Sequence, residues 1–168
     1  MCENKINRHV ARNRAIIQQI GIKYDPKLSI PLVNQIFLMD PGIINVERML
    51  ETLVARTGNL EFVDEAGYDY SDKSELKMAT VHHITGEITI GNMEGKVGAL
   101  RIIIYNAKTG ELAYFFVPKA KVSELCGVCY GKQRHKMRIR LCYHTKNKTY
   151  GKLEPFKLDS FAAMCRLR

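Results

Sequence analysis

The sequence lacks the features that would assign it to several large classes of protein. No apolar run among its 168 residues approaches the ~18 residues that span a bilayer. The N-terminal residues also lack the apolar core of a secretory signal. Five cysteines without an export signal predict reduced thiols rather than a disulfide framework. Neither a GxxxxGK[ST] loop nor a GxGxxG turn is present, so we expect no nucleotide cofactor. These absences predict a soluble, cytoplasmic protein that does not bind membranes.

The hydrophobic pattern predicts an α/β (mixed) fold in one domain over residues 1–168. The apolar spacing is helical at first and changes to a period of two near residue 60. Helices are expected at 4–20, 31–39, 45–57, 119–126 and 158–167. Strands are expected at 59–64, 74–83, 100–106, 111–117 and 136–144, with a short hairpin at 84–90. Helices at the N-terminus followed by a mixed central sheet give the fold class.

Four residues are assigned to the ends of these helices. Gly21 is the expected stop of the first helix, and Gly58 ends the helix at 45–57. Asn45 and Asp159 are the expected N-caps of the helices that follow them.

Positive charge is concentrated in the second half of the chain. Residues 1–95 carry ten basic and thirteen acidic side chains, whereas residues 96–152 carry thirteen basic and two acidic ones. A surplus of this size attracts a polyanion and speeds its association. Its absence near residue 70 indicates that another kind of ligand binds there.

The acidic stretch GYDYSDKSELKMATV, residues 67–81, combines carboxylates with the start of an apolar strand. Side chains two apart on a strand share a face, so Glu75 and Lys77 project together while Leu76 and Met78 turn to the core. With a second carboxylate from the adjoining hairpin, Glu75 could hold a hard cation such as Mg²⁺. Such a metal polarises a phosphodiester and activates water, and the lysine steadies the developing charge.

The segment DYSDKSELKMATV resembles the PD-(D/E)XK motif of the restriction-endonuclease-like nucleases. It is similar to the short-spaced version in the mismatch-repair nicking endonuclease and its restriction-enzyme relatives. The resemblance implies a restriction-endonuclease-like core, a metal-binding Asp, Glu75 as a second metal ligand and Lys77 as the catalytic lysine. It also implies a Glu on the preceding helix, for which we choose Glu51 over Glu47.

The first acid of this motif stays open, because no proline precedes it. Asp69 lies six residues before Glu75, which suits a tight hairpin, and Asp64 lies eleven before it. Asp72 is three residues away and is expected in the turn. We rank them Asp69, Asp64, Asp72.

The run GKQRHKMRIR, residues 131–140, is the expected contact with DNA. Arg138 and Arg140 share one strand face and can reach guanine edges or phosphates, and Gln133 or Asn106 can read adenine. The residues expected to bind DNA are Lys119, Lys121, Gln133, Arg134, Lys136, Arg138 and Arg140.

These features predict a Mg²⁺-dependent, sequence-specific double-stranded DNA endonuclease of restriction or homing type. One small domain that cuts both strands calls for a homodimer. A non-catalytic basic nucleic-acid-binding module and a junction-resolving nuclease on the same fold are the alternatives.

Two other groups of residues resemble sites but are given little weight. Zinc could bind Cys126, Cys129, Cys142 and His144, but the last two fall inside a continuous strand pattern, so we expect none. His83 lies on the face of Glu75 and Lys77, but at six residues past Lys77, or ~20 Å along a strand, it is too far for the same metal.

Overall fold

The computed structural model describes residues 3–25, 27, 45–65, 68–91, 93, 98–128 and 137–168; for residues 3–8, 64, 65, 128 and 137 it describes the backbone alone. Its helical elements are α1 (Glu3–Ile16), the π-helical η1 (Ile17–Gly21), α2 (Ile22–Tyr24), α4 (Val46–Gly58), α5 (Lys119–Leu125), the 3-10 helix η3 (Gly151–Phe156) and α6 (Phe161–Arg166). Its strands are β1 (Phe62–Glu65), β2 (Tyr68–Tyr70), β3 (Glu75–Val81), β4 (Glu87–Ile90), β5 (Leu100–Asn106), β6 (Glu111–Val117), β7 (Cys126–Val128), β8 (Met137–Cys142) and β9 (Lys157–Leu158). The predicted mixed α/β class is confirmed.

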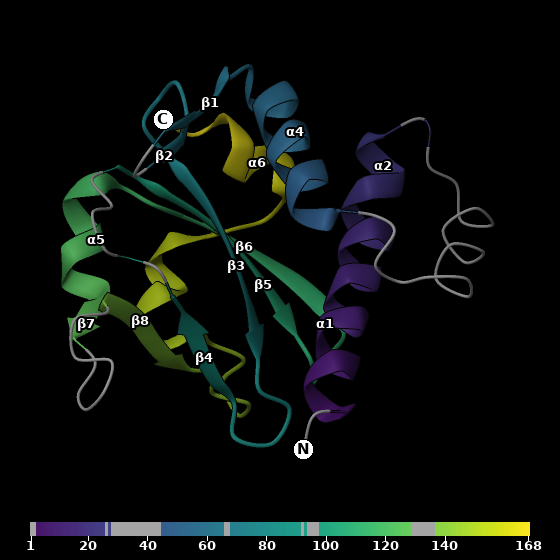
Figure 1. Ribbon diagram of the computed structural model, residues 1–168. Helices are drawn as coiled ribbons and strands as arrows, with labels where there is room; N and C mark the ends of the chain where they lie inside the picture. Colours follow the sequence, from purple (N-terminus) through teal and green to yellow (C-terminus); the bar gives the residue numbers. More distant parts are fainter. Residues whose placement is uncertain are drawn as a thin grey trace.

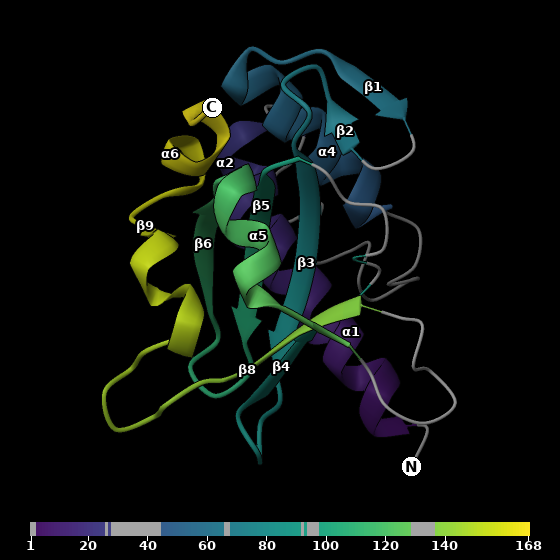
Figure 2. The same cartoon turned by 90° about the vertical axis from the view of Figure 1, so that its left-hand side faces the viewer.

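The strands of the described residues form three sheets, one of which is central. The central sheet has the order β3-β5-β6-β9, and β3 and β5 run parallel while the other neighbours are antiparallel. A second sheet has the order β4-β8-β7, and β1 pairs with β2 in a separate hairpin. Figure 1 shows α1 on one side of the central sheet and β4, β7 and β8 on the other; Figure 2 shows the central sheet face on, with β8 crossing in front of it.

Two hydrophobic cores follow from this layering. The first lies between the helices and one face of the central sheet and includes Ile17, Ile20, Leu50, Leu53, Val54, Leu76, Ile103, Phe161 and Met164. The second lies between the other face and the β4-β8-β7 sheet and includes Ala79, Val81, Ile88, Ile90, Ile102, Ile104, Phe115, Ile139, Leu141 and Leu153. Because side chains alternate along a strand, β3 and β5 each contribute to both cores.

Three helix ends differ from the sequence expectation. Gly21 does not stop the first helix: it keeps helical backbone angles, its carbonyl accepts a hydrogen bond from the Asp25 amide, and the helix continues through η1 to Tyr24. The N-cap of α6 is Ser160 rather than Asp159, because the Ser160 hydroxyl accepts from the Ala163 amide at 3.1 Å. Gly58 is the last residue of α4, and it is Asn59 that takes the left-handed conformation (φ 52°).

Of the other expectations, one is confirmed and one concerns residues outside the described ranges. Asn45 is the N-cap of α4 as predicted, with its side chain accepting from the Arg48 amide at 3.0 Å. The expected helix at 31–39 lies outside the described residues. Strands β2 and β7 were not anticipated, since each is only three residues long. None of the helices in the described residues is long and apolar enough to cross a bilayer.

Candidate active site

A cavity of about 290 Å³ opens where α4, β2 and the edge strand β3 meet α1. Its wall includes four carboxylates and two cationic side chains, which are Glu47, Glu51, Asp69, Glu75, Arg12 and Lys77. The structure therefore places all four residues of the preferred catalytic set, Glu51, Asp69, Glu75 and Lys77, around one cavity. Glu47, set aside in favour of Glu51, lines it as well.

Asp69 is fixed against β3 by backbone hydrogen bonds. Its Oδ2 accepts a hydrogen bond from the Leu76 amide at 2.9 Å, and its own amide donates to the Ser74 carbonyl at 2.9 Å. The short turn at 71–74 thus brings the Asp69 carboxylate beside the first residues of β3. The spacing between Asp69 and Glu75 predicts a tight hairpin here, but β2 pairs with β1 and not with β3, so a turn alone joins the two residues.

Glu75 and Lys77 share a face at the start of β3, as their spacing predicts. Glu75 is 5% exposed, and its Oε1 pairs with the Lys77 ammonium. The side chain of Lys77 is itself only 16% exposed. A half-buried ammonium held at a buried carboxylate is well placed to meet an anionic group that enters the cavity, because water competes poorly there.

The helical wall of the cavity carries concentrated negative charge. Glu51 accepts a hydrogen bond from Arg48 Nη1 at 3.3 Å. Burial raises the pKa of the Glu51 carboxyl, and the Arg48 interaction opposes that rise. The charges of Asp69 and Glu47 raise the Glu51 pKa further. A bound cation would relieve this repulsion.

Of the two alternative first acids, Asp72 does not take the position that Asp69 takes. Asp72 lies in the turn, as expected, where its Oδ2 pairs with Arg101 Nη2 at 2.8 Å. Its Oδ1 accepts from the amide and hydroxyl of Ser74, at 3.0 and 2.5 Å. Asp72 does not line the acidic cavity. Asp64 belongs to β1, and its side chain lies outside the described residues.

The donor set fits magnesium better than a metal that is enclosed by protein ligands. Within the described residues, no three Asp, Glu, His or Cys side chains lie close enough together to hold a metal ion as they stand. Magnesium, however, is usually bound by one or two carboxylates, with water and substrate phosphate completing its coordination. Asp69 and Glu75 can supply those two carboxylates.

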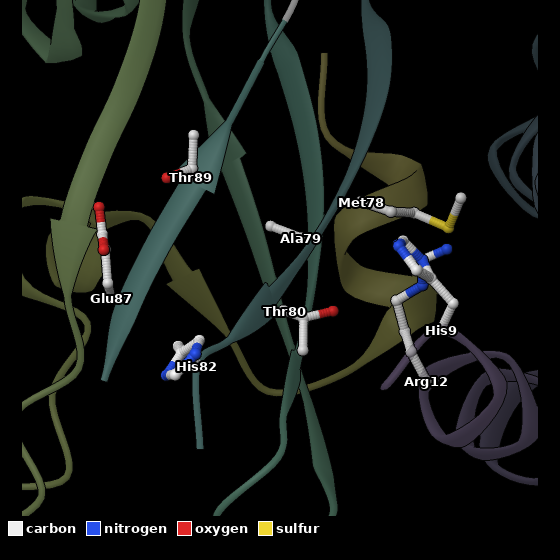
Figure 3. Close-up of a pocket in the computed structure, with 8 residues that line it drawn as sticks. All are labelled: His9, Arg12, Met78, Ala79, Thr80, His82, Glu87 and Thr89. Carbon is white, nitrogen blue, oxygen red and sulfur yellow. The ribbon is translucent and has the colours of Figure 1, made fainter. Parts of the chain in front are cut away.

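Arg12 is a cavity residue that the sequence analysis missed. It projects from α1 and lines both the acidic cavity and a larger one of about 460 Å³ on the same side of β3. Figure 3 shows Arg12 and His9 reaching from α1 toward Met78 and Thr80 of β3. No local motif marks Arg12, because its place depends on how α1 packs on a strand far away in the sequence.

The candidate zinc ligands are not gathered together. Cys126 of β7 lies opposite Ile139 of β8. Ile139 is three residues before Cys142 on the same strand, a separation of ~10 Å. His144 pairs with Thr149 in a separate bridge, and Cys129 lies outside the described residues.

The paired histidines lie beyond the end of β3. His82 stacks on His83, and its Nδ1 accepts from the amides of Ile84 and Thr85 at 3.3 and 3.2 Å. His83 does not line the acidic cavity, as expected from its distance along the strand.

The described part of the expected DNA-binding surface lies on β8 and α5. Arg138 and Arg140 share one face of β8 and line, with Lys152, a cavity of about 210 Å³. Lys119 and Lys121 are exposed on α5, and Lys121 pairs with Glu124 at 2.7 Å. Gln133, Arg134 and Lys136 lie outside the described residues.

Asn106 is not available to read a base, contrary to expectation. It is 1% exposed at the end of β5, and its amide donates to the Tyr150 hydroxyl at 3.3 Å. Its Oδ1 accepts from the Lys108 amide at 3.0 Å, so Asn106 shapes the turn that joins β5 to β6.

No protein-family model matches the sequence, and no curated protein matches it either. The function is therefore inferred from the site itself.

Replacing Asp72 is expected to destabilise the fold rather than only the chemistry. Asp72→Ala leaves the guanidinium of Arg101 buried without its carboxylate, and breaking a buried pair from one side costs about 3 kcal/mol. Urea unfolding measures this loss. The exposed pair Lys121–Glu124 provides the control, since Glu124→Ala is expected to change stability by less than ~0.5 kcal/mol. Equal stability of the two variants would contradict the role given to Asp72.

Replacing Glu51 is expected to have an effect that depends on pH. The pKa of Glu51 is raised in the folded state. Its favourable contribution to the stability of the fold is therefore complete below the pKa of the unfolded chain, about 4.3. That contribution is lost as pH rises through the folded-state pKa. Without divalent cations, Glu51→Gln is therefore expected to raise the melting temperature near neutral pH and to lose this gain near about pH 4. Glu61→Gln, an exposed carboxylate outside the cavity, is the control and should show no such gain.

Proposed function

We propose that this chain is a Mg²⁺-dependent endonuclease that hydrolyses phosphodiester bonds in double-stranded DNA at specific sequences, as restriction or homing enzymes do. The observation that carries the proposal is the meeting of Asp69, Glu75 and Lys77 in one cavity. The turn at 71–74 brings the first acid beside β3, and consecutive same-face positions of β3 provide the other two residues. This is the arrangement that the PD-(D/E)XK resemblance implies, and a restriction-endonuclease-like core is part of the proposal.

Each residue of the cavity has a distinct task in this reaction. A magnesium ion bound by Asp69 and Glu75 would polarise the phosphodiester and lower the pKa of a water molecule. Lys77 donates hydrogen bonds to the attacking water or to the charge that develops on the phosphate. Glu47 and Glu51 add negative charge at the helical wall, which draws a cation into the cavity. The water oxygen bonds to phosphorus as the bond to the leaving oxygen breaks.

The basic part of the chain supports DNA as the substrate. The acidic cavity attracts a cation but repels a phosphate backbone, so DNA needs positive charge elsewhere. Arg138, Arg140 and Lys152 surround one hollow, and Lys119 lies on the neighbouring α5. Cutting both strands with one such site per chain requires a homodimer, with the two copies on a pseudo-palindromic sequence.

Variants of the motif separate cleavage from binding. Glu75→Ala and Lys77→Ala are expected to abolish Mg²⁺-dependent cleavage of a supercoiled plasmid while leaving DNA affinity within a few-fold of wild type. Removing the Glu75 carboxylate relieves repulsion of the phosphates and can tighten binding. Asp69→Asn is expected to lose cleavage as well, because a neutral amide binds Mg²⁺ weakly. Digests with and without EDTA, and a binding assay without divalent metal, measure both properties.

The products of the same digest distinguish the alternatives. Linear plasmid indicates the homodimer, whereas only nicked plasmid indicates a monomer that cuts one strand. Preferential cutting of a branched duplex would identify a junction-resolving nuclease. Full cleavage by Glu75→Ala would refute the nuclease site. No cleavage by the wild type with any divalent metal, together with tightly held zinc, would favour the non-catalytic module.

The arginines of β8 are expected to behave in the opposite way. Arg138→Ala and Arg140→Ala should each weaken DNA binding and reduce the slope of log affinity against log salt by about 0.9 if each contacts one phosphate. An unchanged slope with relaxed sequence preference would instead indicate contact with bases. Arg166→Ala, an exposed arginine on α6, is the matched control. If Arg138→Ala and Arg140→Ala bind DNA as tightly as this control, β8 is not part of the DNA interface.

A further inference from the structure

Two neighbouring cavities meet at α1 and β3. The acidic cavity and the larger one of about 460 Å³ share Arg12 and Met78 in their walls. From the acidic cavity, the shared wall leads along β3 to Thr80 and His82, while Glu87 and Thr89 of β4 form the opposite side (Figure 3). The two cavities therefore lie side by side along β3, with Arg12 and Met78 where they meet.

Negatively charged side chains outnumber positively charged ones in the wall of the acidic cavity. The acidic cavity has four carboxylates but only two cations, and one of these, Lys77, is paired with Glu75. A nucleic-acid strand that enters this cavity brings its phosphates close to these carboxylates, and a further cation close by would reduce the repulsion between them. Arg12 is the described cation that stands at the junction of the two cavities.

The surroundings of Arg12 hold its guanidinium in place. Its Nε and Nη2 both donate to Asn13 Oδ1, at 3.3 and 3.2 Å. Burial lowers the pKa of Arg12, and the nearby charge of Glu47 opposes this change. An arginine stays protonated at neutral pH despite such a shift, so the site keeps its positive charge. A planar guanidinium of this kind can grip two phosphate oxygens at once.

Beyond Arg12, the larger cavity offers neutral hydrogen-bonding groups beside the carboxylate of Glu87. His82 accepts hydrogen bonds at Nδ1, so its neutral imidazole carries the proton on Nε2 and can donate from there. Thr80 and Thr89 contribute hydroxyls to the same wall. These groups suit the sugars and phosphate oxygens of a polynucleotide strand rather than a free metal ion.

We propose that Arg12 binds the backbone phosphate next to the one that is cut, and that the cut strand runs along β3 from the acidic cavity toward His82. The proposal rests on the proposed function, because it takes the acidic cavity as the place of cleavage. It assigns α1 to the substrate interface, in addition to the basic surface on β8 and α5.

Paired arginine variants on α1 test this proposal by binding, without relying on catalysis. Arg12→Gln and Arg14→Gln remove the same charge from the same helix, but Arg14 lines a separate cavity with Gln18, Tyr105 and Gly110. Affinity for one labelled duplex is measured without divalent metal over a series of salt concentrations. Arg12→Gln is expected to weaken binding roughly ten- to hundredfold and to reduce the salt slope by about 0.9. Arg14→Gln is expected to stay within a few-fold of wild type.

A third variant keeps the test decisive if Arg12→Gln folds poorly. Arg12→Lys retains the charge but replaces the planar fork by a single ammonium group, so weaker binding with an unchanged salt slope is expected. Wild-type affinity in Arg12→Lys would overturn the bidentate contact. Circular dichroism melting of all three variants shows which of them are folded.

The outcomes separate this proposal from the proposed function. If the wild type cuts DNA and Arg12→Gln binds and cuts as well as Arg14→Gln, the role of Arg12 is wrong while the nuclease stands. If the wild type never cuts but Arg12→Gln alone weakens binding, Arg12 contacts phosphate while the assignment of the cut site is wrong. Equal binding by both glutamine variants in a protein that never cuts overturns both.

Discussion

The geometry of the site depends on a buried arginine that is not part of it. Arg101 of β5 is fully buried, and its Nη2 pairs with Asp72 at 2.8 Å and donates to the Leu167 carbonyl at 2.7 Å. It thereby ties the turn at 71–74 to the central sheet and to the C-terminal residues. Asp69 and Glu75 lie at the two ends of that turn, so the ion pair sets how close the two carboxylates come. A Cβ at Gly98 would lie 1.4 Å from the carbonyl oxygen of Lys73, and this explains the glycine beside the turn.

A buried ion pair of this kind contributes to specificity more than to stability. Desolvating a guanidinium is costly, and a single carboxylate repays only part of that cost. Within the described residues, Nε and Nη1 of Arg101 have no hydrogen-bond partner, although its guanidinium lies 5.0 Å from the ring centre of Phe116. An apolar side chain could fill the same space, but it would not dictate the position of Asp72. We infer that the role of Arg101 is to position the turn.

The parts of the site that are close in sequence were predictable, and the distant parts were not. The pairing of Glu75 with Lys77 follows from the period of a strand, and the closeness of Asp69 follows from the short turn between it and Glu75. Glu51 could be chosen because it lies on the helix just before that hairpin. Arg12 could not, because only the packing of α1 brings it to β3. For the same reason the buried position of Asn106 was missed: the period of β5 does not show that Tyr150 covers its end.

The acidic and basic residues, which are separated along the sequence, also lie apart in the fold. Carboxylates from α4, β2 and β3 converge on one cavity, and the pKa of Glu51 rises because burial and its acidic neighbours disfavour another negative charge. The basic residues of β8 lie on the other sheet, so they do not neutralise that cavity. Among the described residues, negative charge therefore exceeds positive charge around this cavity. In the proposed function, a divalent cation would offset this excess, and a polyanion held by the basic surface and by Arg12 could then approach the carboxylates. Keeping the two charges apart would thus make the approach of the phosphate depend on the bound metal.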